Sequence, residues 1–356
     1  MGLDMKHVLG WCALVGVFLF LAAPPGGAQP ALPGSRQLPA RTIPVPVTAS
    51  PQMQAIIARP LNPIWNVVPK TAAEWKAVVA ENAAETIATL PAMRAALHVK
   101  VEPTAIAGVK AYIVAPEVIP AANRNRLLLY FHGGGYVLRP GEAGIAEAME
   151  MAGFGHFKVV SVDYRMSPDF PYPAAMDDAM AVYRAALKMA KPENIGIFGT
   201  SAGGSITLAM VLRARTEGLP LPGAIAPGTP WSDMTKTGDS YFTNDMIDNV
   251  LVSNDGFWGA AALLYANGHD LKDPQLSPVY GDMHGFPPTI LTSGTRDLFL
   301  SNTVRVHRKM RQAGVEAELQ VFEGLSHAQY YRDINAPETI DYNTEVAQFF
   351  DKHLGR

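Results

Sequence analysis

The chain has 356 residues, of which 48% are hydrophobic, and its 29 basic and 32 acidic side chains give a net charge of −3. This is the composition of a globular protein with room for one large or two ordinary domains. Because the chain carries no basic cluster, nothing in it would attract a polyanion, and nucleic acid is excluded as an expected partner.

The first segment has the parts of an export signal in the usual sequence: MGLDMKHVLGWCALVGVFLFLAAPPGGAQP. An apolar run from Val8 to Ala23 follows a lysine and precedes Pro-Pro-Gly-Gly-Ala. The run is short for crossing about 30 Å of hydrocarbon, and the small residues suit cleavage after Ala28. We expect a signal peptide over residues 1–28, export to the periplasm or the medium, and no stable membrane insertion afterwards. The alternative is an uncleaved N-terminal anchor.

The single cysteine, Cys12, lies inside that apolar run and would leave with it. The mature chain would then hold neither a disulfide nor a thiolate. A cysteine nucleophile and a Cys-ligated zinc are therefore excluded, and we expect no metal and no cofactor.

From Pro24 to about Pro69 the chain is dense in proline and has no sustained period, which is typical of a linker and a loosely attached arm. Thr71 and Glu74 then have the spacing of a capping box, and a helix is predicted from Thr71 to Leu90. Beyond it, strands are predicted at LHVKV, GVKAYIVAP, RLLLYF, KVVSVDYR, NIGIFG, GAIAPGTP, PPTILTSGT and ELQVFEG. Further helices are predicted over 172–190, 201–217, 302–313 and 337–352.

Strands that alternate with helices predict an α/β fold with right-handed crossovers and a mostly parallel sheet covered on both faces. The stretch 231–273 breaks this rhythm, since it is rich in Asp, Asn and Gly and holds the apolar segment GFWGAAALLYA. An insertion here would fold over the C-terminal edge of the sheet, where such folds bind ligands. It is a candidate lid.

Gly199-Thr200-Ser201-Ala202-Gly203 fits the pattern G-x-S-x-G between a predicted strand and a predicted helix. A strand that reverses sharply into a helix strains the serine backbone, and flanking side chains would collide. The Ser201 hydroxyl would then be held out at the helix N-terminus, which makes it a candidate nucleophile. The alternative is a Gly-rich turn with an N-capping serine.

A serine nucleophile needs a base and the base needs an orienting carboxylate, in the chain order Ser, Asp or Glu, His. Among the later histidines, His327 alone lies in a loop just beyond a strand, in FEGLSHAQYY. Asp297 lies just after the strand PPTILTSGT and is the candidate acid. Glu323 is its one serious rival, and a turn-capping aspartate is the alternative interpretation of Asp297.

The stretch His132-Gly133-Gly134-Gly135 directly follows a buried strand, about 70 residues before Ser201. Three glycines let backbone N–H groups point into a site without side chains in the way. Together with the N–H of Ala202, they are candidates for an oxyanion hole. His132 alone could also be a metal ligand or a core histidine.

These residues resemble the hormone-sensitive-lipase-like family of serine esterases, GTSAGG branch, within the α/β-hydrolase superfamily. HGGG, GTSAGG, DYRMSPDFPYPAAMDD, DPQLSP, GTRDLF and SHA occur in the order of that family's landmarks. The resemblance covers residue 99 to the C-terminus. It implies an α/β-hydrolase fold with a helical cap, with Ser201 as nucleophile, Asp297 as acid, His327 as base, and Gly133, Gly134, Gly135 and Ala202 around the oxyanion.

The resemblance also implies a division of the chain. Residues 29–97 would hold the proline-rich arm and the N-terminal cap helices, and 98–356 the catalytic domain, with a cap insertion at about 231–266. The candidates for lining the substrate pocket are aromatic residues, for which core packing is the alternative role: Trp65, Trp75, Tyr136, Trp231, Phe257 and Trp258.

The expected function is hydrolysis of a small-molecule carboxylic ester with a short or medium acyl chain, through an acyl-enzyme. The same three groups would serve an acyltransferase or a lactone hydrolase. A non-catalytic ligand-binding protein of this fold is a remote alternative, since it should have lost one of the three groups. A homo-oligomer is compatible with the sequence.

Overall fold

The computed structural model describes residues 34–355, so the expected signal peptide and Cys12 lie outside the described part of the chain. Residues 34–44 form no helix or strand, and the compact unit that begins at Val45 holds every element named below. The N-terminal helices and the sheet belong to this one unit. The expected division at residue 97 stays a prediction.

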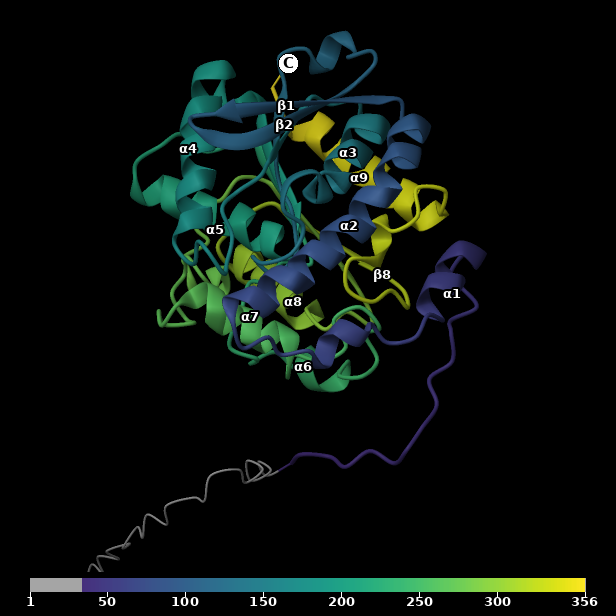
Figure 1. Ribbon diagram of the computed structural model, residues 1–356. Helices are drawn as coiled ribbons and strands as arrows, with labels where there is room; N and C mark the ends of the chain where they lie inside the picture. The colour runs from purple at the N-terminus through teal and green to yellow at the C-terminus, as the bar shows by residue number, and fades with distance from the viewer. Residues whose placement is uncertain (1–33, 356) are drawn as a thin grey trace, which may run out of the picture. The chain divides into compact units, whose positions relative to one another are not determined.

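An eight-stranded sheet forms the centre of this unit (Figure 1). The strands stand in the order β1-β2-β4-β3-β5-β6-β7-β8, and β2 is antiparallel to both of its neighbours while the strands from β4 to β8 are parallel. Their bounds are β1 Val99–Ile106, β2 Val109–Pro116, β3 Leu127–Phe131, β4 Val159–Val162, β5 Ile195–Thr200, β6 Ala224–Gly228, β7 Thr289–Gly294 and β8 Ala317–Phe322. All eight strands were predicted, and the mostly parallel α/β sheet is confirmed.

Two hydrophobic clusters cover the two faces of the sheet, and alternate residues of each parallel strand enter different clusters. In β3, Leu127, Leu129 and Phe131 belong to one cluster, and Leu128 and Tyr130 belong to the other. Continuous apolar runs are what a parallel sheet buried on both faces requires. Burial on both faces is therefore the physical basis of the runs by which these strands were predicted.

Helices supply the other half of each cluster. Helices α3 (Ala146–Gly155) and α9 (Pro337–His353) pack together on one face, as Figure 1 shows, and α4 (Ala174–Met189), α5 (Ala202–Thr216) and α8 (Leu300–Gln312) contribute to the cluster on the other. Helix α2 runs from Ala72 to Ala96 and begins with the predicted capping box between Thr71 and Glu74. It continues past the expected end at Leu90, with Pro91 inside it.

Two helices outside the insertion after β6 were not predicted from the sequence. Helix α1 (Pro51–Ile57) lies inside the proline-rich arm, where the Ser50 hydroxyl caps it by accepting from the N–H of Met53 at 3.2 Å. Helix α3 buries residues nearly all round, including Glu147 and Glu150. A helix buried on every side has no polar face, so its sequence shows no helical period.

The insertion after β6 folds into two short helices, α6 (Ser240–Thr243) and α7 (Phe257–Ala266), joined by irregular backbone. The apolar segment that marked it becomes α7, in which Phe257, Ala261 and Tyr265 are buried. No helix within residues 34–355 is long and apolar enough to span a membrane.

The start of α5 depends on glycine, because the carbonyl oxygen of Phe131 lies only 1.8 Å from where a Cβ of Gly203 would stand. We predict that Gly203→Ala lowers the free energy of unfolding by about 3 kcal/mol or more, since backbone of β3 would have to move. The control is Gly314→Ala, where the space is open and only φ +74° opposes a side chain; it should cost about 1 kcal/mol. Urea unfolding of both variants checks this, and similar losses would contradict it.

Candidate active site

Ser201 stands at the junction of β5 and α5 with φ 62° and ψ −119°, a strained backbone for a non-glycine residue. Its N–H donates to Gly228 at 2.9 Å and its carbonyl accepts from Trp231 at 3.0 Å, so neighbouring backbone holds the turn in place. A Cβ on Gly199 would lie 2.2 Å from the Phe131 oxygen. The glycines of the pattern are thus required by close backbone contact.

Asp297 and His327 meet although they follow different strands. Asp297 lies just beyond the end of β7 and His327 in the loop after β8, and His327 Nδ1 lies 3.0 Å from Asp297 Oδ1. Both side chains are buried. With Nδ1 donating to the carboxylate, the other ring nitrogen, Nε2, is left as a proton acceptor.

The Asp297 carboxylate has its own partners. Its Oδ1 accepts from the N–H of Phe299 at 2.8 Å, and its Oδ2 accepts from the hydroxyls of Ser293 at 2.9 Å and of Thr229. These donors hold the carboxylate in the orientation in which it meets the imidazole.

Ser201 and His327 line the same cavity, which has a volume of about 410 Å³. Gly133 and Gly134 line it as well. The alcohol, the imidazole and the HGGG loop therefore open onto one space large enough for a small organic molecule.

The HGGG loop lies directly against the serine turn, since a Cβ on Gly133 would be 2.8 Å from the Thr200 oxygen. Gly134 has φ +117° and Gly135 φ +63°, which favour glycine at both positions. Within residues 34–355, the backbone N–H groups of Gly134, Gly135 and Ala202 have no hydrogen-bond acceptor. Donors left open beside an alcohol can bind an oxyanion.

His132 is buried and stacks on Tyr164, with 4.3 Å between ring centroids. Burial lowers its pKa to about 4, although its Nδ1 lies 2.7 Å from the Gly133 oxygen. A neutral ring packed on tyrosine supports the core interpretation of this histidine. Asp163, from the DYRMSP landmark, accepts from the N–H of Gly141 at 2.8 Å and so braces the loop that follows the HGGG stretch.

A buried polar group lies behind the serine turn. The Thr200 hydroxyl donates to Glu147 at 2.6 Å, and the Tyr342 hydroxyl donates to the same oxygen at 3.0 Å. Burial raises the pKa of Glu147 and raises that of Glu150 further. Sequence reasoning did not find these carboxyl groups, because they lie in the unpredicted helix α3.

Glu323, the rival acid, is exposed and accepts from the Thr48 hydroxyl at 2.8 Å, away from His327. Asp297 is therefore the candidate that contacts the imidazole.

Elsewhere among the described residues, three side chains come close enough to share a cation: Glu316, Glu318 and His353. The Lys352 ammonium already bonds to both of these carboxylates.

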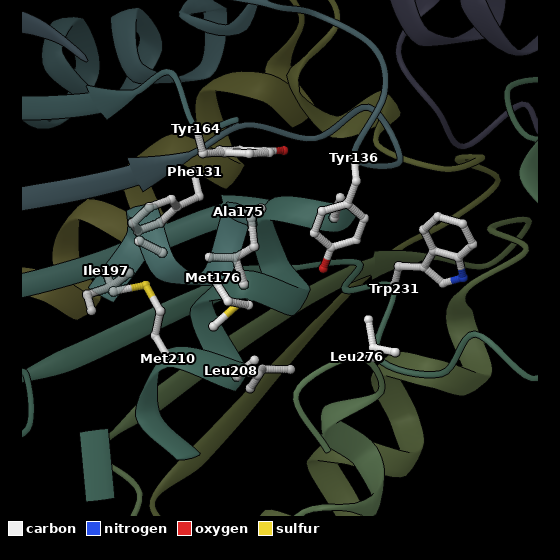
Figure 2. Close-up of a cluster of buried hydrophobic side chains, with 14 of the residues drawn as sticks. Phe131, Tyr136, Tyr164, Ala175, Met176, Ile197, Leu208, Met210, Trp231 and Leu276 are labelled. Atoms are coloured by element: carbon white, nitrogen blue, oxygen red, sulfur yellow. The ribbon is translucent and has the colours of Figure 1, made fainter. Parts of the chain in front are cut away.

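Of the aromatic pocket candidates, Trp258 lines the cavity, with its indole N–H donating to the Leu251 oxygen at 3.0 Å. Trp75, Tyr136, Trp231 and Phe257 are buried in the same core cluster as Trp258 but do not line this cavity. Figure 2 shows Tyr136 and Trp231 among apolar side chains of this cluster. Core packing, the alternative role stated for them, is the role that their burial favours.

Several residues of the cavity wall were not singled out from the sequence. They come from the arm, α2, the loop after β3, the insertion and the segment after His327, and include Asn62, Ile64, Val78, Glu81, Glu85, Arg139, Val250, Leu251, Tyr331 and Arg332. Tyr331 and Arg332 follow His327 closely and Arg139 follows the HGGG stretch closely, and this nearness was the available signal. The rest lie far from the site candidates in sequence.

Comparison with known proteins identifies the family. The alpha/beta hydrolase fold family matches residues 128–331. The chain is 45% identical to esterase E25, whose crystal structure superposes with a TM-score of 0.87 over 90% of this chain and 99% of that one. The chain belongs to the hormone-sensitive-lipase-like esterases. A bacterial esterase assigned to the hormone-sensitive lipase family is 26% identical, with a TM-score of 0.68 over 81% of this chain and 100% of its own.

Two further relatives agree with this membership. An esterase of Acinetobacter venetianus is 28% identical over 70% of this chain and 82% of its own length. Esterase EstE5, in a crystal soaked with p-nitrophenyl butyrate, is 30% identical, with a TM-score of 0.68 over 74% of this chain and 91% of its own. This hormone-sensitive-lipase-like chain is a carboxylic ester hydrolase with the α/β-hydrolase fold.

The buried carboxyl groups of this esterase predict how its stability depends on pH. Because the folded-state pKa of Glu147 and Glu150 lies above the ordinary 4.5, the unfolded chain loses these protons first as the pH rises. The free energy of unfolding should therefore fall as the pH rises from 4.5 through the raised values. The double variant Glu147→Gln, Glu150→Gln should lose less stability over that range.

Urea unfolding between pH 4.5 and 8.5 checks this, with the exposed Glu102→Gln as control. The control should keep the slope of wild-type stability against pH. A double variant with the wild-type slope would contradict the prediction.

Proposed function

We propose that this esterase hydrolyses short- to medium-chain carboxylic esters through an acyl-enzyme on Ser201, with His327 as the proton carrier and Asp297 as its orienting partner. The observation that carries the proposal is the 3.0 Å contact between Asp297 and His327, with His327 and Ser201 opening onto one cavity. A serine hydroxyl is a poor nucleophile by itself, so it needs the imidazole that opens onto the same cavity as its base.

In the first half of the reaction, His327 Nε2 takes the proton of Ser201 Oγ as the oxygen attacks the ester carbonyl. The tetrahedral intermediate then expels the alcohol, which takes that proton from the imidazolium. In the second half, a water molecule gives a proton to His327 and attacks the acyl group. Collapse returns the proton to Ser201 and releases the carboxylic acid.

The oxyanion of each tetrahedral intermediate would be bound by backbone N–H groups of Gly133, Gly134, Gly135 and Ala202. The support for this role is that the N–H groups of Gly134, Gly135 and Ala202 have no acceptor within the described chain, and that Gly133 and Gly134 line the same cavity as Ser201. Each such donor is typically worth a factor of about 10² to 10³ in turnover.

A short or medium acyl chain is supported by the cavity of about 410 Å³, whose wall holds both apolar and charged residues. Val78, Leu251 and Trp258 are among the apolar residues, and Glu81 and Arg332 are among the charged ones. The relation to EstE5, which was soaked with p-nitrophenyl butyrate, points the same way.

We predict that Ser201→Ala lowers kcat on p-nitrophenyl butyrate by about 10⁴-fold or more, because the acyl-enzyme can no longer form. Asp297→Asn should lower it by about 10³ to 10⁴-fold, since the amide no longer selects the required imidazole tautomer. Thermal unfolding and circular dichroism show whether each variant is folded. A folded Ser201→Ala protein with wild-type turnover would end the proposal.

Two further measurements complete this test. A fluorophosphonate probe should label the wild type at Ser201 and leave the alanine variant unlabelled. A series of p-nitrophenyl esters of increasing acyl length should give the highest kcat/KM at short or medium chains.

We also propose that the chain is exported and cleaved after Ala28. The support is that a lysine, an apolar run and small residues follow one another in its first segment, as in an export signal. N-terminal sequencing of the protein from culture medium or periplasm should begin at Gln29. Recovery of the uncut chain in the membrane fraction would favour the anchor instead.

A further inference from the structure

A second buried aspartate lies next to the candidate catalytic pair. Asp248 belongs to the insertion, between α6 and α7, and its side chain is 0% exposed. The sequence marked this stretch only as rich in Asp, Asn and Gly. Nothing in the steps proposed above uses Asp248.

All four hydrogen bonds to the Asp248 carboxylate come from backbone N–H groups. Oδ1 accepts from Val250 at 2.8 Å and Leu251 at 3.0 Å, and Oδ2 accepts from Leu298 at 2.8 Å and His327 at 3.2 Å. Burying a carboxylate is costly, and charge-assisted bonds of this kind offset that cost.

The partners of Oδ2 belong to the two loops whose side chains meet in the site. Leu298 directly follows Asp297, and His327 is the candidate base itself. One oxygen atom therefore links the two backbones close to the 3.0 Å contact between their side chains. The neighbouring Asn244 adds to this link, because its amide donates to the carbonyl of Asp297 at 2.8 Å.

The partners of Oδ1 belong to the wall of the cavity. Val250 and Leu251 both line it, and the Leu251 carbonyl accepts from the Trp258 indole. The same carboxylate thus connects the cavity wall with the loops of Asp297 and His327.

We propose that Asp248 is a positioning residue of the esterase, which holds the loops of Asp297 and His327 at the separation that the hydrogen bond between these two side chains requires. This inference rests on the proposed roles of Ser201, Asp297 and His327. Asp248 itself touches none of the reacting atoms and acts through the two backbones that it joins.

The titratable groups that face Asp248 are Asp297, from the loop after β7, and His327, from the loop after β8. Burial, and then the charge of Asp297, raise the pKa of Asp248 to about 6, while His327 opposes the shift. Above this pH the ionised carboxylate can accept all four bonds. Below it, a bound proton occupies one of the accepting positions, and the link between the loops weakens.

Asp233 supplies a matched control within the same insertion. It is also 0% exposed, and it accepts from the Thr235 N–H at 2.8 Å, the Tyr280 hydroxyl at 3.1 Å and the Arg305 guanidinium. None of these partners lies in the loops of Asp297 or His327. Asp233→Asn therefore removes the charge of an equally buried carboxylate. It leaves the hydrogen bonds that Leu298 and His327 donate to Asp248 in place.

The experiment compares Asp248→Asn with Asp233→Asn on p-nitrophenyl butyrate, after circular dichroism has shown that each is folded. The oxygen of the side-chain amide in Asp248→Asn could still accept two of the four hydrogen bonds. Its NH₂ group would face the other two backbone N–H donors and cannot accept from them, so the loops should separate. We expect Asp248→Asn to lower kcat by about 10- to 100-fold with KM changed less than about threefold. Asp233→Asn should keep kcat within about threefold of the wild type.

A folded Asp248→Asn variant with kcat within threefold of the wild type would overturn the inference, and so would equal losses in both variants. Failure of the proposed function would look different, because Ser201→Ala would then retain activity or the wild type would hydrolyse no ester.

A measurement on the wild type decides the case if Asp248→Asn does not fold. Amide exchange of Leu298 and His327 is followed by NMR at pH 8 and pH 5, with each rate corrected for the intrinsic pH dependence. We expect protection of both amides to fall several-fold at pH 5 as Asp248 takes up a proton, while amides within α4 keep theirs. Unchanged protection of Leu298 and His327 would overturn the inference.

Discussion

The close approach of two backbones, that of β3 and that of the turn into α5, is the constraint on which the site depends. The carbonyl oxygen of Phe131 occupies the space that a side chain would need at Gly199 or Gly203, at 2.2 and 1.8 Å from the Cβ positions. Because α5 begins in contact with β3, the loop that continues β3 must pass beside Ser201. The open N–H groups of the HGGG loop and the place of Ser201 in the cavity wall are therefore consequences of one packing contact.

The insertion after β6 connects the loops of the site with one another and with the N-terminal arm. Asp248 joins the loops that follow β7 and β8, and its neighbour Asn249 reaches the N-terminal arm, donating to the carbonyl of Ile56 at 3.1 Å and accepting from Gln329 at 2.7 Å. The backbone carbonyl of Asn249 also accepts from Asn62, which lines the cavity. Two successive residues thus connect the wall of the substrate cavity with the loops that hold the acid and the base.

Much of the fold could be predicted from the sequence, because burial leaves a pattern in the residues of most strands and helices. Each parallel strand is buried on both faces, so runs such as that ending at Phe131 are apolar without interruption, and each strand was found. Helix α2 was found from its capping box. Helix α3 was missed because it is buried on every side and carries no amphipathic period, and α1 because a seven-residue helix is too short to show one.

The sequence by itself determined the candidate nucleophile, acid and base, because each stands directly after a strand and the carboxyl ends of parallel strands share one edge of the sheet. Only the tertiary structure decided which aromatic residues face the cavity and which fill the core, since both roles call for the same side chains. It alone showed Asp248 beside His327 as well. An aspartate in a polar stretch reads as an exposed turn, and its burial comes from contacts with loops some 50 and 79 residues further along the chain.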